Sequence, residues 1–104
     1  MTVNVITAKL TKQMLDNGRF GLIIDLRDYD EFLQGHLPGA INIPINEILD
    51  RINEIQKYKS SKVLLYCEHG IQSISAGKVL ILNGFDKVYS LDKGLGSYNY
   101  ALYN

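Results

Sequence analysis

The chain has 104 residues, 46% of them hydrophobic, and its 11 basic residues balance 11 acidic ones. A chain of this length forms one domain, which can bury a core without metal ions or disulfides. Because no block of like charge stands out, composition gives no indication of binding to nucleic acid or to an anionic membrane surface. We therefore expect residues 1–104 to form a single domain that binds neither.

Cysteine usage and the apolar pattern bear on the compartment. Cys67 is the one cysteine in the sequence, so no internal disulfide can form. The sequence has no signal-like start and no apolar run near membrane-spanning length. These features favour a cytoplasmic protein whose thiol stays reduced.

The first quarter of the chain reads as strand, helix, strand. The pattern predicts a short edge strand over 3–6 and a helix over 8–16, which Thr7 can cap and Gly18 ends. The mostly apolar, branched run over 20–25 is typical of a strand that is covered on both faces.

Shorter elements follow in the middle of the chain. We predict a short helix over 29–34 with Asp28 as its cap, and then a strand over 40–43. Isoleucine and leucine recur at helical spacing over 45–55, which predicts an amphipathic helix there. The apolar run over 63–66 predicts another strand.

The last part of the chain repeats the alternation. The pattern predicts a helix over 73–83 with Gly84 as a left-handed cap, a strand over 88–91 and a final short helix from Leu95. Strands that alternate with helices imply an α/β fold. We expect a mainly parallel sheet of about five strands, flanked by helices on both faces.

Cys67 directly follows the strand over 63–66 and opens a short polar loop before a helix. In open α/β sheets, ligands bind outside the carboxyl ends of the strands. Loop amides and the N-terminus of the next helix favour negative charge there, and so favour a thiolate. Cys67 is therefore a candidate nucleophile. The alternative is a small buried hydrophobic residue, as free cysteines often are.

Three separated segments resemble one family. The segment over 25–44, DLRDYDEFLQGHLPGAINIP, matches every fixed position of the long first signature of rhodanese-like domains. The Cys67 loop resembles the active-site loop of that family in place and length, and the segment over 84–94 resembles its closing segment. The resemblance extends from about residue 5 to residue 98 and implies a rhodanese-like fold for the whole chain.

We interpret the first signature as mainly structural. Arg27 and Glu31 are spaced to pair across one helical turn, or to tie the helix to the loop after it. His36 is expected to hydrogen-bond to the backbone of that loop rather than to touch a substrate.

The resemblance implies a sulfurtransferase. A Cys67 thiolate would attack the outer sulfur of a polysulfide, a persulfide or thiosulfate, and a thiol or cyanide would then take sulfur from the Cys67 persulfide. A protein persulfide as donor, or a thioredoxin-like reductant as acceptor, is a candidate partner. No metal or other cofactor is needed. The residues expected to bind the substrate are Glu68, His69, Gly70, Ile71, Gln72 and Ser73.

This loop departs from the family pattern in its charge. Glu68 and Gln72 stand where many members carry basic residues, which leaves His69 as the one group in the loop able to carry positive charge. Attraction for a dianion such as thiosulfate should be weaker, so a polysulfide or a protein persulfide fits better. Glu68 is expected to face solvent, although an inward position would oppose anions further. Lys93 could restore some positive potential at the pocket mouth.

Two other functions compete with sulfur transfer. A phosphatase of the same fold would need an arginine six residues after the cysteine, where this chain has Ser73, and a longer loop. That function is disfavoured. A non-enzymatic sulfur carrier or a protein-binding module stays open, because a carrier and an enzyme would use the same nucleophile.

Overall fold

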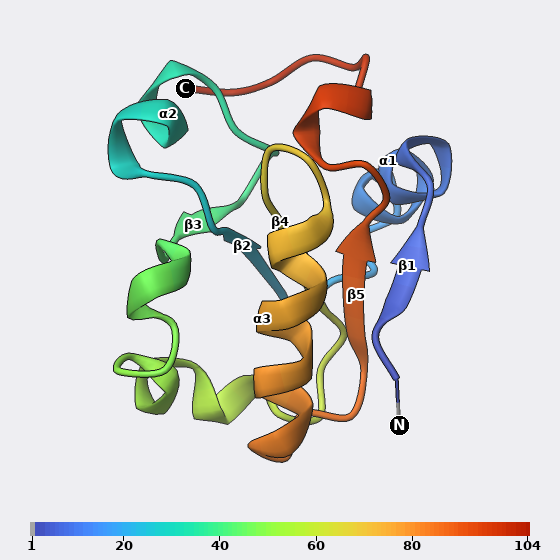
Figure 1. Cartoon of the computed structure of the whole chain (residues 1–104). Coiled ribbons are helices and arrows are strands. Elements are labelled where there is room, and N and C mark those ends of the chain that lie inside the picture. The colour runs from blue at the N-terminus through green and yellow to red at the C-terminus, as the bar shows by residue number, and fades with distance from the viewer. Residues whose placement is uncertain (1) are drawn as a thin grey trace.

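The computed structural model describes residues 2–104, so residue 1 of the predicted domain lies outside the described residues. Its centre is a sheet of five parallel strands in the order β1-β5-β4-β2-β3 (Figure 1). The strands are β1 (Asn4–Ile6), β2 (Leu22–Asp25), β3 (Ile41–Asn42), β4 (Val63–Tyr66) and β5 (Val88–Leu91). The predicted α/β fold is confirmed, and the strand that precedes Cys67 is central in the sheet.

Three α-helices and three 3₁₀ segments connect and cover the strands. They are α1 (Ala8–Asp16), α2 (Tyr29–Gln34), α3 (Ile71–Leu82), η1 (Ile45–Glu47), η2 (Ile52–Tyr58) and η3 (Leu95–Ser97). Thr7 caps α1 as predicted, because its hydroxyl accepts the Leu10 N–H at 3.1 Å. Asp28 occupies the N-cap position of α2, but its side chain makes no capping hydrogen bond.

The predicted helix over 45–55 is wrong in type. The chain forms η1 and η2 there, with turns between them. The apolar positions are nevertheless on the buried side, since Ile48, Ile52 and Ile55 all belong to the core. Ile52 and Ile55 are three residues apart, a spacing that also fits the three-residue turn of a 3₁₀ helix.

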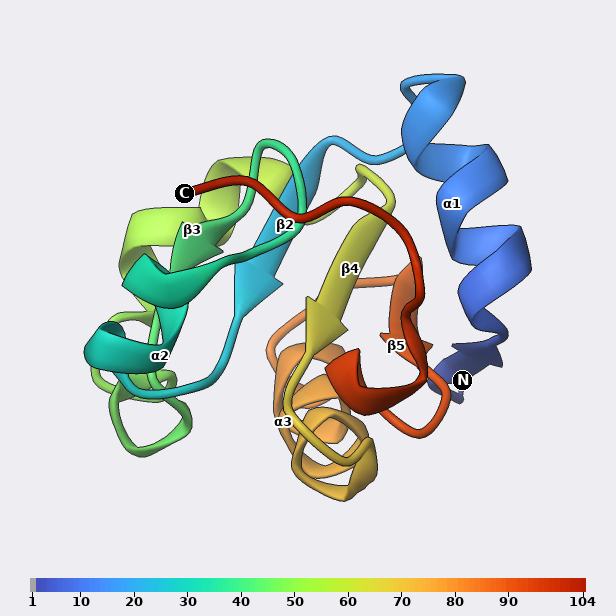
Figure 2. The same cartoon turned by 90° about the horizontal axis from the view of Figure 1, so that it is seen from above.

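Both faces of the sheet are covered. Along β4, Val63 and Leu65 belong to a core cluster shared with α3 and η2, whereas Leu64 and Tyr66 belong to a second cluster with residues of α1 and η3. This alternation follows from the two-residue period of a strand. Figure 2 shows α1 and α3 on opposite sides of the sheet, as the sequence predicts.

The carboxyl ends of the central strands lie together. Asp25 at the end of β2 pairs in register with Tyr66 at the end of β4. The segment after β5 lies directly against the loop after β4, because a Cβ added at Gly94 would lie 2.4 Å from the Glu68 carbonyl oxygen. Within residues 2–104, none of the helices combines the length and the apolar character needed to cross a membrane.

Candidate active site

Cys67 lies where the sequence predicts, directly after β4, and is 2% exposed. It contributes to the wall of a pocket of about 310 Å³. The other residues that line this pocket are Glu68, His69, Ile71 and Gln72. Four of the six residues expected to bind the substrate therefore line the pocket. The other two, Gly70 and Ser73, contact the sulfur atom instead.

Two uncharged groups approach the Cys67 Sγ atom. The Gly70 N–H donates to Sγ at 3.1 Å, and the Cys67 thiol donates to the Ser73 Oγ atom at 3.6 Å. Gly70 has a φ of 95°, and a Cβ there would lie 2.8 Å from the backbone nitrogen of Lys93. Glycine at this position therefore lets the loop turn its N–H toward the sulfur.

Ser73 belongs to the first turn of α3, which begins two residues earlier than predicted. Gly70 takes the N-cap position, so Ser73 does not cap this helix. The Ser73 side chain is completely buried and donates to the Gly70 carbonyl at 3.2 Å. Its oxygen also lies 2.6 Å from the Ser90 hydroxyl on β5, a contact that sequence reasoning missed.

A charged cluster borders the pocket on the side of β2. The Arg27 guanidinium holds the completely buried Asp25 carboxylate at 2.9 Å and lies 3.6 Å from the Glu68 carboxylate. Burial lowers the pKa of Arg27, but hydrogen bonds and charge interactions with Asp25, together with the nearby Tyr66 and Glu68, raise it overall. Arg27 also donates to the Gly35 carbonyl, so it ties the end of α2 to this cluster.

Of the two suggested roles, the pairing of Arg27 with Glu31 is wrong, because Arg27 pairs with the carboxylates of Asp25 and Glu68. Its bond to the Gly35 carbonyl does tie the helix to the loop after it. The Glu68 side chain is 42% exposed, so it lies at the rim and is neither fully solvated nor turned onto the sulfur. Lys93 is exposed, and its backbone lies against Gly70 of the loop, but it is not among the residues that line the pocket.

A neutral, buried side chain, that of Tyr66, lies next to the Asp25 carboxylate of this cluster. Tyr66 is completely buried, and its hydroxyl accepts the Leu37 N–H at 3.0 Å. Burial and the neighbouring Asp25 carboxylate raise the pKa of Tyr66 far above its usual value. His36 Nδ1 lies 2.8 Å from the Leu37 carbonyl oxygen, which confirms the predicted backbone contact.

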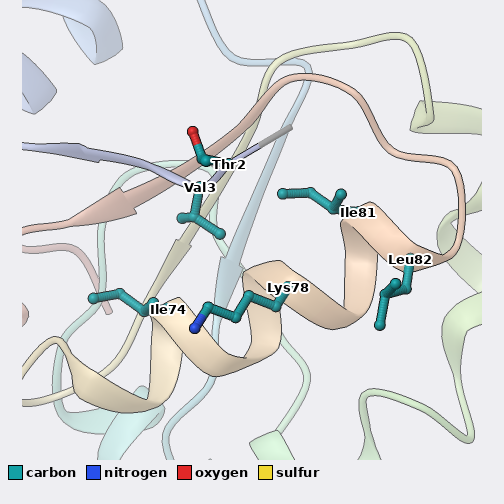
Figure 3. Close-up of a pocket in the computed structure, with 6 residues that line it drawn as sticks. All are labelled: Thr2, Val3, Ile74, Lys78, Ile81 and Leu82. Carbon is teal, nitrogen blue, oxygen red and sulfur yellow. The ribbon is translucent and has the colours of Figure 1, made fainter.

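A larger pocket of about 460 Å³ lies elsewhere, between α3 and the segment that leads into β1 (Figure 3). Its lining residues are Thr2, Val3, Ile74, Lys78, Ile81 and Leu82. The described part of its wall offers no thiol, imidazole or carboxylate, so its chemistry is limited to apolar contact, one hydroxyl and one ammonium group. The Cys67 pocket is the candidate active site.

The arrangement around Cys67 is that of an α/β protein with a buried cysteine that borders a pocket and accepts a hydrogen bond from a backbone amide of the following loop. The sequence matches the rhodanese-like domain family over residues 7–101, and the chain belongs to this family. Within residues 2–104 no group of three or more metal-binding side chains lies together.

Three known proteins illustrate the relationship. The chain is 35% identical over 79 residues to thiosulfate sulfurtransferase GlpE from Shewanella oneidensis, covering 76% of each protein. It is 29% identical over 90 residues to the putative sulfur carrier protein YrkF from Bacillus subtilis, covering 86% of this chain and 48% of that protein. It superposes on a rhodanese-like domain protein from Staphylococcus aureus with a TM-score of 0.84, 26% identity and 97% coverage of each chain.

The chain spans only about half the length, or less, of several curated relatives that it matches. The curated relatives also differ in the activity that their names state, since one is a thiosulfate sulfurtransferase and another a putative sulfur carrier. The family is therefore defined, and the reaction of this chain has to be argued from its own site.

Proposed function

We propose that this protein transfers sulfane sulfur through a persulfide formed on Cys67. The observation that carries the proposal is the environment of the Cys67 sulfur. It lies at the carboxyl end of a central parallel strand, accepts the Gly70 N–H at 3.1 Å and borders a pocket. A thiolate there is held by backbone dipoles and is reached from the pocket side.

The reaction has two displacement steps. In the first, the Cys67 thiolate attacks the outer sulfur of the donor. An S–S bond to Cys67 forms while the donor S–S bond breaks, and the donor leaves as a shorter polysulfide, a thiolate or, from thiosulfate, sulfite. In the second, an external thiolate or cyanide attacks the outer sulfur of the persulfide. Cys67 then leaves as a thiolate, and no net electrons or protons are required.

The pocket favours donors with little negative charge. Its lining contains the Glu68 carboxylate and no arginine or lysine, since the nearest guanidinium, on Arg27, is already shared by two carboxylates. A dianion therefore meets no arginine or lysine among the lining residues, where His69 is the one side chain able to carry positive charge. A polysulfide or a persulfide carried by a partner protein suits this pocket better than thiosulfate does.

A sulfur carrier is the second candidate. The absence of arginine and lysine from the described pocket lining favours it, because a carrier exchanges sulfur with partner proteins and need not turn over small anions. A related protein is named a putative sulfur carrier. In either case the acceptor is external, because Cys67 has no second cysteine in the chain to resolve its persulfide. The reducing cytoplasm would keep such a thiol ready to react.

The test is the intact mass of the reduced protein after brief treatment with polysulfide and, separately, with thiosulfate. We expect wild type to gain one sulfur atom, faster from polysulfide, and Cys67→Ser to gain none. Repeated turnover with cyanide would favour the enzyme, and loading without turnover would favour the carrier. No gain from either donor would contradict both, and faster loading from thiosulfate would contradict the argument from charge.

A further inference from the structure

A buried hydroxyl lies behind the nucleophile and is not used in the reaction described above. Ser90 is the polar residue of β5, completely buried, with its Oγ atom 2.6 Å from the Ser73 Oγ atom. Among residues 2–104 its hydroxyl has no other hydrogen-bond partner. Ser73 in turn lies 3.6 Å from the Cys67 Sγ atom. The three side chains therefore form a chain of contacts from β5 to the sulfur.

The direction of these hydrogen bonds follows from the available partners. If Ser73 donated to Ser90, the Ser90 proton would be left without an acceptor in a buried site, which is unfavourable. Ser90 therefore donates to Ser73. In the thiol form, Ser73 accepts from both Ser90 and Cys67 and donates to the Gly70 carbonyl at 3.2 Å. The thiol hydrogen of Cys67 and the hydroxyl hydrogens of Ser73 and Ser90 then each have an acceptor.

Loss of the thiol proton changes one of these bonds. The Ser73 O–H no longer receives a proton from Cys67 and can rotate to donate to the thiolate. The Gly70 carbonyl remains satisfied, because an N-cap carbonyl accepts the first backbone hydrogen bond of its helix. The sulfur anion then has two donors, the Ser73 O–H and the Gly70 N–H.

We propose that Ser90 is a positioning residue that acts through Ser73 to stabilise the Cys67 thiolate. Its O–H holds the Ser73 oxygen in place and polarises it, so that the Ser73 O–H becomes a stronger donor to the sulfur anion. The inference deepens the proposed function of the same site, and its relevance to sulfur transfer rests on that function. The titratable side chains that line the pocket with Cys67, Glu68 and His69, are the same in every variant below.

The test measures the thiolate without any sulfur donor. The readouts are the ultraviolet absorbance of the thiolate at neutral pH and the rate of alkylation by iodoacetamide. We expect Ser73→Ala to lower the thiolate-to-thiol ratio about tenfold, the effect of losing a hydrogen bond to a charged group. We expect Ser90→Ala to lower it about two- to fivefold, because it removes only the polarising bond.

Two further variants separate this role from packing. Ser90→Thr keeps the hydroxyl on a strand-compatible side chain and should restore the wild-type ratio. Ser75→Ala, on the exposed side of α3, should leave the ratio unchanged. Thermal unfolding of each variant confirms that the folded protein is measured.

Two results would overturn the proposal. One is a folded Ser90→Ala with the thiolate absorbance of wild type. The other is an equal loss in Ser90→Ala and Ser90→Thr, which would show that the volume of the side chain matters rather than its hydroxyl. Neither result would affect sulfur loading of wild-type Cys67, so this inference and the proposed function fail separately.

Discussion

The ends of β2 and β4 are neighbours in the sheet and use polar groups in opposite ways. At the end of β2, the buried Asp25 carboxylate is neutralised by Arg27, which also reaches Glu68. At the end of β4, the groups that contact the Cys67 sulfur are an amide N–H and a hydroxyl, both uncharged. Full charges pair at one strand end, and uncharged dipoles contact the Cys67 sulfur at the other.

The difference has an energetic consequence. A buried carboxylate that loses its cation costs several kcal/mol, so the β2 end tolerates little change. Neutral hydrogen bonds contribute about 1 kcal/mol each, so the β4 end can be adjusted without unfolding the protein. Substitutions at the two ends should therefore separate stability from reactivity.

The largest effect is expected at the charged end. Arg27→Ala leaves the Asp25 carboxylate buried without a cation and should lower the free energy of unfolding by about 3–5 kcal/mol, measured in urea. The control is Arg51→Ala, whose side chain is 34% exposed and pairs with Glu47 and Glu54 on the surface. That variant should lose about 1 kcal/mol or less. Equal losses in the two variants would remove the distinction between the strand ends.

A smaller effect is expected where the segment after β5 supports the Cys67 loop. Gly94 has a φ of 68°, and an added Cβ would lie 2.4 Å from the Glu68 carbonyl oxygen. Gly18 has a similar φ of 61° but open space around it. Gly18→Ala should cost about 1–2 kcal/mol for its backbone conformation alone.

Gly94→Ala should cost more than Gly18→Ala and should also slow persulfide formation, because the loop has to move. Urea denaturation and sulfur loading measure the two effects. Normal loading by Gly94→Ala would show that sulfur binding by the Cys67 loop does not depend on the close approach of Gly94 to Glu68.

The next substitution is at Tyr66, which pairs in register with Asp25 and immediately precedes Cys67. Tyr66→Phe leaves the buried Leu37 N–H without its acceptor and should cost about 1–3 kcal/mol at neutral pH. Burial raises the pKa of Tyr66 in the folded state. When the pH exceeds 10.0, the ordinary pKa of tyrosine, the folded state therefore keeps the phenol proton of Tyr66, whereas the unfolded state loses it.

Wild type should therefore lose stability as the pH rises above about 10, and part of this loss should be absent from Tyr66→Phe. Urea denaturation of the two proteins across this pH range measures the difference. Parallel pH profiles would contradict the raised pKa of Tyr66.

The smallest effect concerns the charge at the pocket rim. Glu68→Gln removes the carboxylate and frees Arg27 from one of its two partners, so loading from thiosulfate should become about two- to fivefold faster. Gln72→Glu should slow it by a similar factor. Both effects should shrink at high salt, because rim charges are screened. Loading rates that do not respond to either variant would show that charge does not select the donor.

The sequence predicted the parts of the molecule that depend on local pattern. Apolar runs identified the strands and hence placed Cys67 at the carboxyl end of one of them, which the structure shows to be central in the sheet. The pattern could not separate an α-helix from two 3₁₀ segments over 45–55, because spacings of three residues fit both. Local pattern therefore indicated the buried face correctly and the helix type wrongly.

Contacts between distant residues were beyond the sequence. Arg27 and Glu68 meet because β2 and β4 are neighbours, and nothing in the spacing of these residues indicates it. One feature of the sequence could have drawn attention to Ser90, namely that a serine stands within the mostly apolar strand β5. Its contact with Ser73 depends on how α3 packs on β5, which residue types alone do not fix.

The most direct test of the central claim is a single turnover of the loaded protein. Wild type would be treated with polysulfide, freed of excess donor and mixed with cyanide, and thiocyanate would be counted against protein. We predict about one thiocyanate per loaded Cys67 and a return to the unmodified mass, since the outer sulfur leaves with the acceptor. Loaded protein that yields no thiocyanate, or an equal yield from Cys67→Ser, would contradict sulfur transfer through Cys67.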